Sequence, residues 1–385
     1  MKNINTYFLT NDSKKKILEM TRFYPQTLIS KYAHSILNKM ILSGSQYFTV
    51  ENISNYSLFD IKKTFNTFCS KINIPNNSKL MSDISNMDLA IASKLIINDY
   101  KINIYFIYSS SLAKSEKIMG VIIHAISTFC NMFPYDYNNL DIFVALDENT
   151  RILNHNPMLN IPQRFEHYKQ QSSAFNPSGM TNRGQNIIIL TKIEEIIKLL
   201  FHELIHYIGI DASLYDVYLD VEWDLADTKI NLNEAYTEYI SVLLSTMYQS
   251  IHYANLNNLD IYKTFDFIID IEINYSIQLL ANILFFYGYD ENNYLLFFNN
   301  GNKKLSCPIY IFSYIFVRTF LLLNYVKLLD LTHGELRLSP ENITLIKRYG
   351  SSTHSNLKMF YSAIKNSHLY NNISYLSINL DWQKF

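Results

Sequence analysis

The chain of 385 residues has few cysteines, glycines and prolines, and its positive and negative charges nearly cancel. The three cysteines, Cys69, Cys130 and Cys307, are widely spaced and odd in number, which excludes a disulfide framework and a zinc site built from CxxC pairs. The net charge of −1 lacks the basic excess of a nucleic-acid-binding protein, so we expect no nucleic-acid partner. Only 17% of residues are charged and 48% are hydrophobic, which excludes a largely disordered chain.

The first residues, MKNINTYFLTNDSKKK, contain no apolar run of the secretory type, and we expect a cytoplasmic protein of a reducing compartment. The segment 309–329 is apolar enough to resemble a membrane span, but Arg318 lies near its centre. We therefore interpret it as a buried core helix and expect no stable membrane span. The abundance of Asn, Ile, Tyr, Lys and Phe is typical of an AT-rich genome, such as that of a large DNA virus.

Three regions are distinguished by their sequence texture. Residues 1–98 are predicted to form a helical N-terminal region, with apolar residues at helical spacing in 28–41 and 84–97 and a break at 73–79. Residues 99–250 are predicted to form a central domain, and residues 251–385 a helical C-terminal region. The central region alternates strand-like segments (102–110, 140–148 and 186–191) with helices, around a long polar loop at 149–185. The fold class is therefore α+β, dominantly helical, with a small central sheet packed on one long helix.

The segment 192–209 contains the sequence His202-Glu203-Leu204-Ile205-His206. Two histidines four residues apart on a helix share a face and can bind one metal ion, while Glu203 beside them can take a proton from a water on that ion. A capping box formed by Thr191 and Glu194 and a glycine stop at Gly209 support the helix independently. The alternative is a helix with two core or surface histidines and a solvated glutamate, since a pattern this short also arises by chance.

A catalytic zinc site needs three protein ligands and an open position, so a third ligand must come from elsewhere. The segment NEAYTE, residues 233–238, begins a second helix, on which Glu234 and Glu238 share a face. One carboxylate can bind zinc while the other accepts the ring N–H of a zinc-bound histidine. Glu222 could be the third ligand in place of Glu234. The alternative without a metal is that Glu234 and Glu238 are two surface glutamates on an amphipathic helix.

The combination of HELIH and NEAYTE resembles the gluzincin zinc metallopeptidases, whose thermolysin-like members carry HExxH on one helix and an NExxxD-type segment on the next. The resemblance implies one catalytic Zn²⁺ held by His202, His206 and Glu234, with Glu203 as the catalytic base and Glu238 as the outer partner of a histidine. Glu238 departs from the pattern, because the thermolysin-like members carry Asp there. The close match covers about fifteen residues, and the order of strands and helices before the first motif also resembles a zincin half-domain. The resemblance implies that residues 99–250 form a zincin-like catalytic domain and that the helical region 251–385 completes its cleft.

Other segments have weaker implications. The acidic stretch 211–227 would either line a cleft that prefers basic substrate residues, bind calcium, or simply form a solvated acidic face; it has no EF-hand spacing. The segment SGMTNRGQNIIILT, residues 178–191, resembles the edge strand on which zincins bind an extended substrate. A donor for the developing oxyanion is sought in Tyr349, with His354 and His333 as alternatives.

The predicted function is a zinc-dependent peptidase that hydrolyses peptide bonds with a zinc-activated water, with a peptide or protein as its substrate. Two alternatives stay open. The first is a zinc-containing scaffold that binds proteins with little or no hydrolysis, against which the intact Glu203 argues. The second is a zinc hydrolase of a non-peptide bond, which would use the same ligands.

Overall fold

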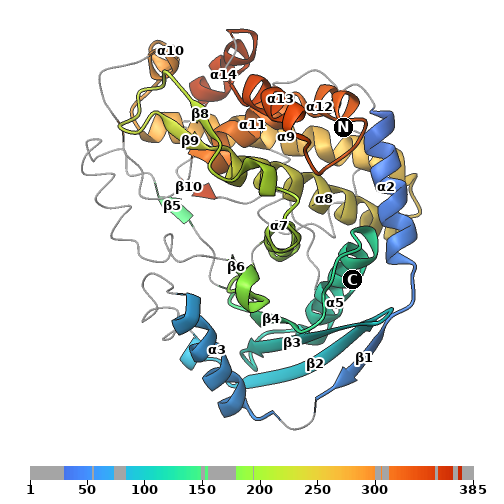
Figure 1. The fold of residues 1–385 in the computed structure, drawn as a ribbon. Coiled ribbons are helices and arrows are strands. Elements are labelled where there is room, and N and C mark those ends of the chain that lie inside the picture. Colours follow the sequence, from blue (N-terminus) through green and yellow to red (C-terminus); the bar gives the residue numbers. More distant parts are fainter. Residues whose placement is uncertain are drawn as a thin grey trace.

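The computed structural model describes residues 30–53, 56–72, 84–148, 152–154, 179–193, 195–299, 305, 312–351, 354–366 and 372–374. Within these ranges a mixed sheet lies at one end of the molecule and most of the helices lie on one side of it (Figure 1). The fold is thus α+β and dominantly helical, as the sequence predicts.

The main sheet has six strands in the order β1-β2-β3-β4-β7-β6. Strands β3, β4 and β7 are parallel, whereas β1, β2 and β6 pair antiparallel to their neighbours. The strands are β1 (Thr49–Asn52), β2 (Leu89–Ile97), β3 (Tyr100–Tyr108), β4 (Leu140–Ala145), β6 (Gly179–Asn182) and β7 (Ile187–Leu190). Two small sheets pair β5 (Ile152–Asn154) with β10 (Asn372–Ser374) and β8 (Tyr218–Asp220) with β9 (Lys229–Asn231).

Side chains alternate between the two faces of this sheet, as the pleat requires. On β3, Ile104 and Phe106 belong to the main hydrophobic core on the side of helices α5 and α7, while Tyr105 and Ile107 pack under α3 on the opposite side. The covering helices are α3 (Leu58–Ile72), α5 (Ser115–Met132) and α7 (Ile196–Ile208). The sheet is therefore buried on both faces, and α7 is held against one of them.

The remaining helices lie mostly in a layer beyond α7, and α2 runs beside α5 (Figure 1). They are α2 (Lys31–Gly44), α8 (Leu232–Asn257), α9 (Ile261–Phe286), α10 (Tyr294–Phe298), the π-helical segment η5 (Phe312–Val317), α11 (Arg318–Leu323), α12 (Tyr325–Leu331), α13 (Pro340–Gly350) and α14 (His354–Asn366). Polar caps begin several of them: the side chains of Ser30, Asn231 and Asp260 accept backbone N–H groups at the starts of α2, α8 and α9.

The predicted helix over 84–97 is wrong for most of its length, because residues 89–97 form strand β2. Ile91, Leu95 and Ile97 face the main core and Ala90 and Ala92 face α3, an alternation of period two. Strand β2 carries apolar residues on both faces because it is buried between two layers of helices. Apolar residues spaced in this way also fit a helix, which is why the sequence predicts one. The sheet therefore extends to the N-terminal side of residue 99.

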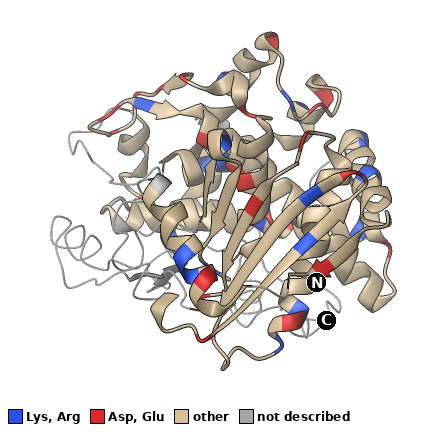
Figure 2. Ribbon diagram, turned by 60° about the horizontal axis from the view of Figure 1, so that its bottom comes forward, with Lys and Arg blue, Asp and Glu red and all other residues tan. Residues whose placement is uncertain are grey.

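Charged side chains are few and of mixed sign on the described ribbon. Figure 2, which brings the sheet side of the molecule forward, shows Lys and Arg interspersed with Asp and Glu. By length and composition, residues 261–285 of α9 are apolar enough to cross a membrane, but 94% of the relevant window is buried inside the protein. The segments 312–323 and 325–331 would pass the same test only as one span, and they are bent by 73°. Arg318, in the apolar segment singled out in the sequence, is buried.

Candidate metal centre

Helix α7 carries the HExxH sequence. It begins at Ile196 rather than near Thr191, so the predicted capping box does not start the helix, and Glu194 lies outside the described residues. The predicted stop is confirmed: Gly209 adopts a left-handed conformation, with φ of 66°, and its N–H bonds to the carbonyl oxygen of His206. A glycine suits this position because it has no Cβ to strain, and the left-handed turn leaves His206 in the last turn of α7.

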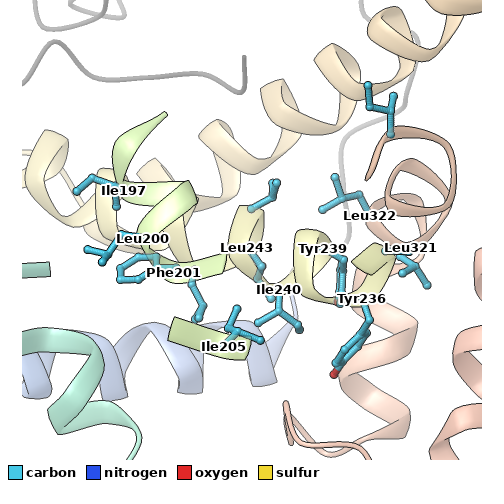
Figure 3. Packing of buried hydrophobic residues seen from close by; sticks show 14 of the residues in the cluster. Ile197, Leu200, Phe201, Ile205, Tyr236, Tyr239, Ile240, Leu243, Leu321 and Leu322 are labelled. Atoms are coloured by element: carbon cyan, nitrogen blue, oxygen red, sulfur yellow. The ribbon is translucent and has the colours of Figure 1, made fainter. Parts of the chain in front are cut away.

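Helix α8 brings the second motif against α7. Its N-cap, Asn231, ends the β8–β9 hairpin and fixes the first turn of α8, which contains Glu234. The two helices are joined by apolar packing along their length, shown in Figure 3 for Phe201 and Ile205 of α7 and for Ile240 and Leu243 of α8. The histidines and Glu234 thus lie on two rigid helices that share one hydrophobic core, which fixes their relative positions.

Three donor atoms converge between these helices. The Nε2 atoms of His202 and His206 lie 3.1 Å apart, and Glu234 Oε2 lies 3.6 Å from the first and 3.5 Å from the second. Zinc bonded tetrahedrally at about 2.0–2.2 Å separates its ligand atoms by roughly 3.3–3.6 Å. Glu234 Oε2 is also buried without a hydrogen-bond partner among the described residues. Both the triangle and the unpaired carboxylate oxygen therefore fit a bound zinc ion, and the structure brings together the three residues predicted as its ligands.

Each histidine has a carboxylate behind it. Nδ1 of His202 lies 3.0 Å from Glu238 Oε2, and Nδ1 of His206 lies 2.7 Å from Asp211 Oδ2. A proton on each Nδ1 satisfies these contacts and leaves both Nε2 atoms with a free lone pair, which is the tautomer that binds a metal. The predicted role of Glu238 agrees with this position. Asp211 is an additional partner that was not singled out in the sequence, and it is fully buried and hydrogen bonded to the Asn233 amide.

The electrostatics of these groups follow from their burial and mutual contacts. Burial alone would lower the pKa of His202, but its contacts with Glu234 and Glu238 outweigh this and raise the pKa to about 9. Burial would raise the pKa of Glu234, whereas its contacts with the two histidines hold that pKa far below the usual value. The two imidazoles and the Glu234 carboxylate thus stabilise one another's charged forms. The described residues with converging metal-binding atoms are His202, His206 and Glu234.

Glu203 lies beside this triangle and faces strand β6. Thr181 Oγ1 donates to Glu203 Oε2 at 2.6 Å, and a Cβ added at Gly179 would overlap the carboxylate, lying 2.9 Å from Glu203 Cδ. Burial raises the pKa of Glu203, against the opposing influence of His202 and His206. A buried carboxyl group of raised pKa next to a metal-binding triangle has the character of a general base.

Strand β6 is the edge of the six-stranded sheet at the side of α7, and it runs antiparallel to β7. Gly179 and Thr181 face Glu203, while Met180 packs on the opposite side with the residues under α3. The segment 178–191 was predicted to supply such an edge strand. Residues 179–182 of this segment form the edge strand β6, whereas residues 187–190 form β7 inside the sheet.

Tyr314 is the tyrosine that contacts the centre among the described residues. Its ring lies 6.0 Å from the His202 ring between centroids, and burial together with Glu234, Glu238 and Glu203 raises the pKa of its phenol, which is hydrogen bonded to Glu234. It lies on η5, more than a hundred residues from α7, so no local pattern in the sequence distinguishes it from the other 29 tyrosines.

The tyrosine and histidines predicted as oxyanion donors lie elsewhere or are only partly described. Tyr349 lies on α13, half-buried against the main core. His333 is exposed and pairs with Tyr32, and His354 begins α14. Their predicted role is not supported by a contact with the three ligand atoms within the described part of the chain.

The acidic stretch divides into buried and exposed residues. Asp211 belongs to the metal centre, and Asp224 is buried and hydrogen bonded to Tyr289. The others are exposed, as expected for a solvated acidic face: Asp216, Asp220, Glu222 and Asp227. Glu222, the rival third ligand, is among them.

Comparison with known proteins gives one relative across the whole length. No family model matches the chain, and no solved structure matches it. The chain is 33% identical over 391 residues to "Uncharacterized protein R210" of Acanthamoeba polyphaga mimivirus, an alignment that covers 98% of this chain and 99% of that protein. A relative from this virus agrees with the large-DNA-virus origin indicated by the composition. At this identity and coverage, the chain belongs to the same protein family as R210 of the mimivirus.

Proposed function

We propose that this protein is a zinc-dependent peptidase of the gluzincin type. The observation that carries the proposal is the triangle of His202 Nε2, His206 Nε2 and Glu234 Oε2, with edges of 3.1, 3.5 and 3.6 Å. This His₂Glu set leaves a fourth position for water, which is the composition of a catalytic zinc site rather than a structural one. The side chains of His206 and Glu234 are 14% and 20% exposed, so the site is not sealed from solvent.

When bound, zinc lowers the pKa of a coordinated water and polarises the carbonyl of the scissile bond. Glu203 lies next to the ligand triangle, accepts the proton of the attacking water, and later gives a proton to the leaving amine. Thr181 fixes the carboxylate of Glu203 through its hydrogen bond. The hydroxyl of Tyr314, beside Glu234 and His202, is the donor best positioned for the developing oxyanion.

The edge strand β6 beside Glu203 favours an extended peptide as the substrate. Strand β6 pairs with β7 on one side and forms the edge of the sheet on the other, and a peptide that adds to this edge uses its backbone groups as a further strand. Gly179 and Thr181 of the same strand contact Glu203, so a peptide bound there lies close to the general base. This proximity favours hydrolysis of peptide bonds over a zinc scaffold without hydrolysis.

The proposal is tested by metal analysis combined with a peptide-library digest. We expect about one zinc per chain in protein purified without chelator. The wild-type protein should cleave a subset of the library, and Glu203→Gln should keep its zinc but lose roughly 10²–10⁴-fold in rate.

Cleavage by Glu203→Gln at the wild-type rate would remove Glu203 from the role of base. Zinc binding without any peptide cleavage would favour the scaffold or a non-peptide substrate. Protein that carries no zinc after reconstitution would overturn the proposal as a whole.

A further inference from the structure

Four buried charged side chains from three helices lie directly behind His202. Glu195 and Lys198 come from the start of α7, Glu238 from α8 and Arg318 from α11. Each of them is no more than 8% exposed, and they comprise two cations and two carboxylates. We call these four residues the rear charge cluster.

The contacts within the cluster converge on one oxygen of Glu238. Oε1 of Glu238 lies 2.5 Å from Lys198 Nζ and 3.3 Å from Arg318 Nη1, while Oε2 lies 3.0 Å from Nδ1 of His202. The two carboxylate oxygens are thus used separately, one by the cations and the other by the histidine. This division fixes the rotation of the carboxylate about its last bond.

The two cations are themselves held in place. Lys198 Nζ lies 3.0 Å from Glu195 Oε2, and Nη2 of Arg318 donates to the Ser276 hydroxyl on α9 at 3.3 Å. Lys198 also precedes His202 by four residues, so both side chains lie on the same face of α7. The carboxylate of Glu238 therefore has Lys198 and Arg318 on one oxygen and the His202 ring on the other.

The cluster explains how a glutamate can stand at this position. A glutamate has one more rotatable bond than an aspartate and loses more conformational freedom when it is held in one position. A buried carboxylate also needs charged or hydrogen-bonding partners to remain ionised. We infer that Lys198 and Arg318 are positioning residues of the metal centre, which hold Glu238 in the orientation that fixes the tautomer of His202 and thereby strengthens zinc binding.

This inference rests on the proposed zinc site but not on peptidase activity, so its test measures zinc affinity. The variants Lys198→Gln and Arg318→Gln remove one charge each and retain a hydrogen-bonding group. Zinc dissociation constants are measured by competition with a chromophoric chelator, and folding is checked by circular dichroism and thermal unfolding. We expect each variant to bind zinc roughly 10–100-fold more weakly, as typical for loss of an outer partner of a ligand.

Four further proteins separate positioning from a general effect on stability. Arg318→Lys restores the charge and should recover most of the affinity. Arg318→Gln combined with Glu238→Gln should bind zinc no more weakly than Glu238→Gln alone, because Arg318 acts through Glu238. Lys192→Gln is the matched control: Lys192 forms another buried ion pair, with Asp147, and this variant should lose stability while binding zinc as the wild type does.

Wild-type zinc affinity in the folded Lys198→Gln and Arg318→Gln proteins would overturn the inference, as would losses that add in full in the double variant. If neither protein folds, Glu195→Gln provides a milder change that releases Lys198 from one side; it should weaken zinc binding several-fold, and unchanged affinity would also overturn the inference. Peptide cleavage is a separate readout: zinc-bound wild type that cleaves no peptide contradicts the proposed function and leaves these affinities valid.

Discussion

The hydroxyl of Thr181 donates a hydrogen bond of 2.6 Å to Oε2 of Glu203, which joins the edge strand β6 to the HExxH helix α7. The two residues are 22 positions apart in the chain. The hydrogen bond therefore fixes the position of the side chain that would activate water relative to the strand that would bind a peptide. Because Glu203 is not one of the three converging ligands, a change at this contact should affect catalysis and leave metal binding intact.

Thr181→Val should reduce peptide cleavage and leave zinc content unchanged. Valine has nearly the same shape but no hydroxyl, and a hydrogen bond to a charged group contributes about 1.5–3 kcal/mol, which corresponds to roughly 10–150-fold in rate. Thr181→Ser should recover most of the activity. The control is Met180→Leu, on the opposite face of the same strand, which should behave as wild type. Full activity in Thr181→Val would show that the hydroxyl does not position Glu203.

Gly179→Ala should also impair catalysis without emptying the metal site. A methyl group at this position would overlap the Glu203 carboxylate, so the carboxylate or strand β6 must shift. A displacement of about 1 Å in a catalytic group costs on the order of 10²-fold in rate. Gly120→Ala is a suitable control, because nothing lies within 4 Å of its added Cβ. Steady-state cleavage rates and zinc content, measured on both proteins, decide the outcome.

The carboxylates around the histidines should differ in their effects on zinc. Glu234→Ala removes a ligand and should yield protein that is essentially free of zinc, since two histidines do not hold the ion against water. Glu238→Ala and Asp211→Ala each remove an outer partner and should weaken zinc binding roughly 10–100-fold. Dissociation constants from chelator competition check this ranking. If the Asp211→Ala protein bound no zinc and the Glu234→Ala protein retained it, the roles of Asp211 and Glu234 would be reversed.

The sequence predicts the local parts of this site and misses those that depend on tertiary contacts. His202, Glu203 and His206 are found because helical spacing alone places the two histidines on one face, and Glu234 and Glu238 for the same reason. The contacts of Thr181 and Tyr314 are long-range and follow no periodicity. Asp211 lies only five residues from His206, but the acidic stretch around it conceals its role.

The same distinction applies to the fold. The strands at 102–110, 140–148 and 186–191 were predicted because short β-branched runs lie between turn signals, and they correspond to β3, β4 and β7. The strand at 89–97 was missed because a strand buried on both faces loses the alternation that identifies strands. The helical interpretation of residues 251–385 is confirmed for the part of that region that the structure describes, apart from the brief strand β10.

A pair of partly buried histidines outside the candidate metal centre predicts loss of stability in acid. His252 packs against His124 and Tyr248, and burial, followed by the nearness of His124, lowers the pKa of His252 to about 4. The unfolded chain binds this proton near pH 6.5, so the native state is destabilised as pH falls from about 7, by about 2 kcal/mol at pH 5 from this residue alone.

His252→Phe keeps an aromatic ring at this position but removes the titrating group. The difference in unfolding free energy between pH 7 and pH 5 should therefore decrease by about 2 kcal/mol. Denaturant unfolding at the two pH values measures it. An identical pH dependence in wild type and His252→Phe would contradict the prediction.

The strand order has a consequence for shortened forms of the protein. Strand β2 pairs with β3 along all nine residues from Leu89↔Tyr108 to Ile97↔Tyr100, and β1 pairs with β2 in turn. A chain that began at residue 99 would expose the backbone of β3 as a long, apolar, unpaired edge, which is a template for self-association. Residues 99–250 are thus not expected to fold as an independent unit, and attempts to produce them alone should give aggregates.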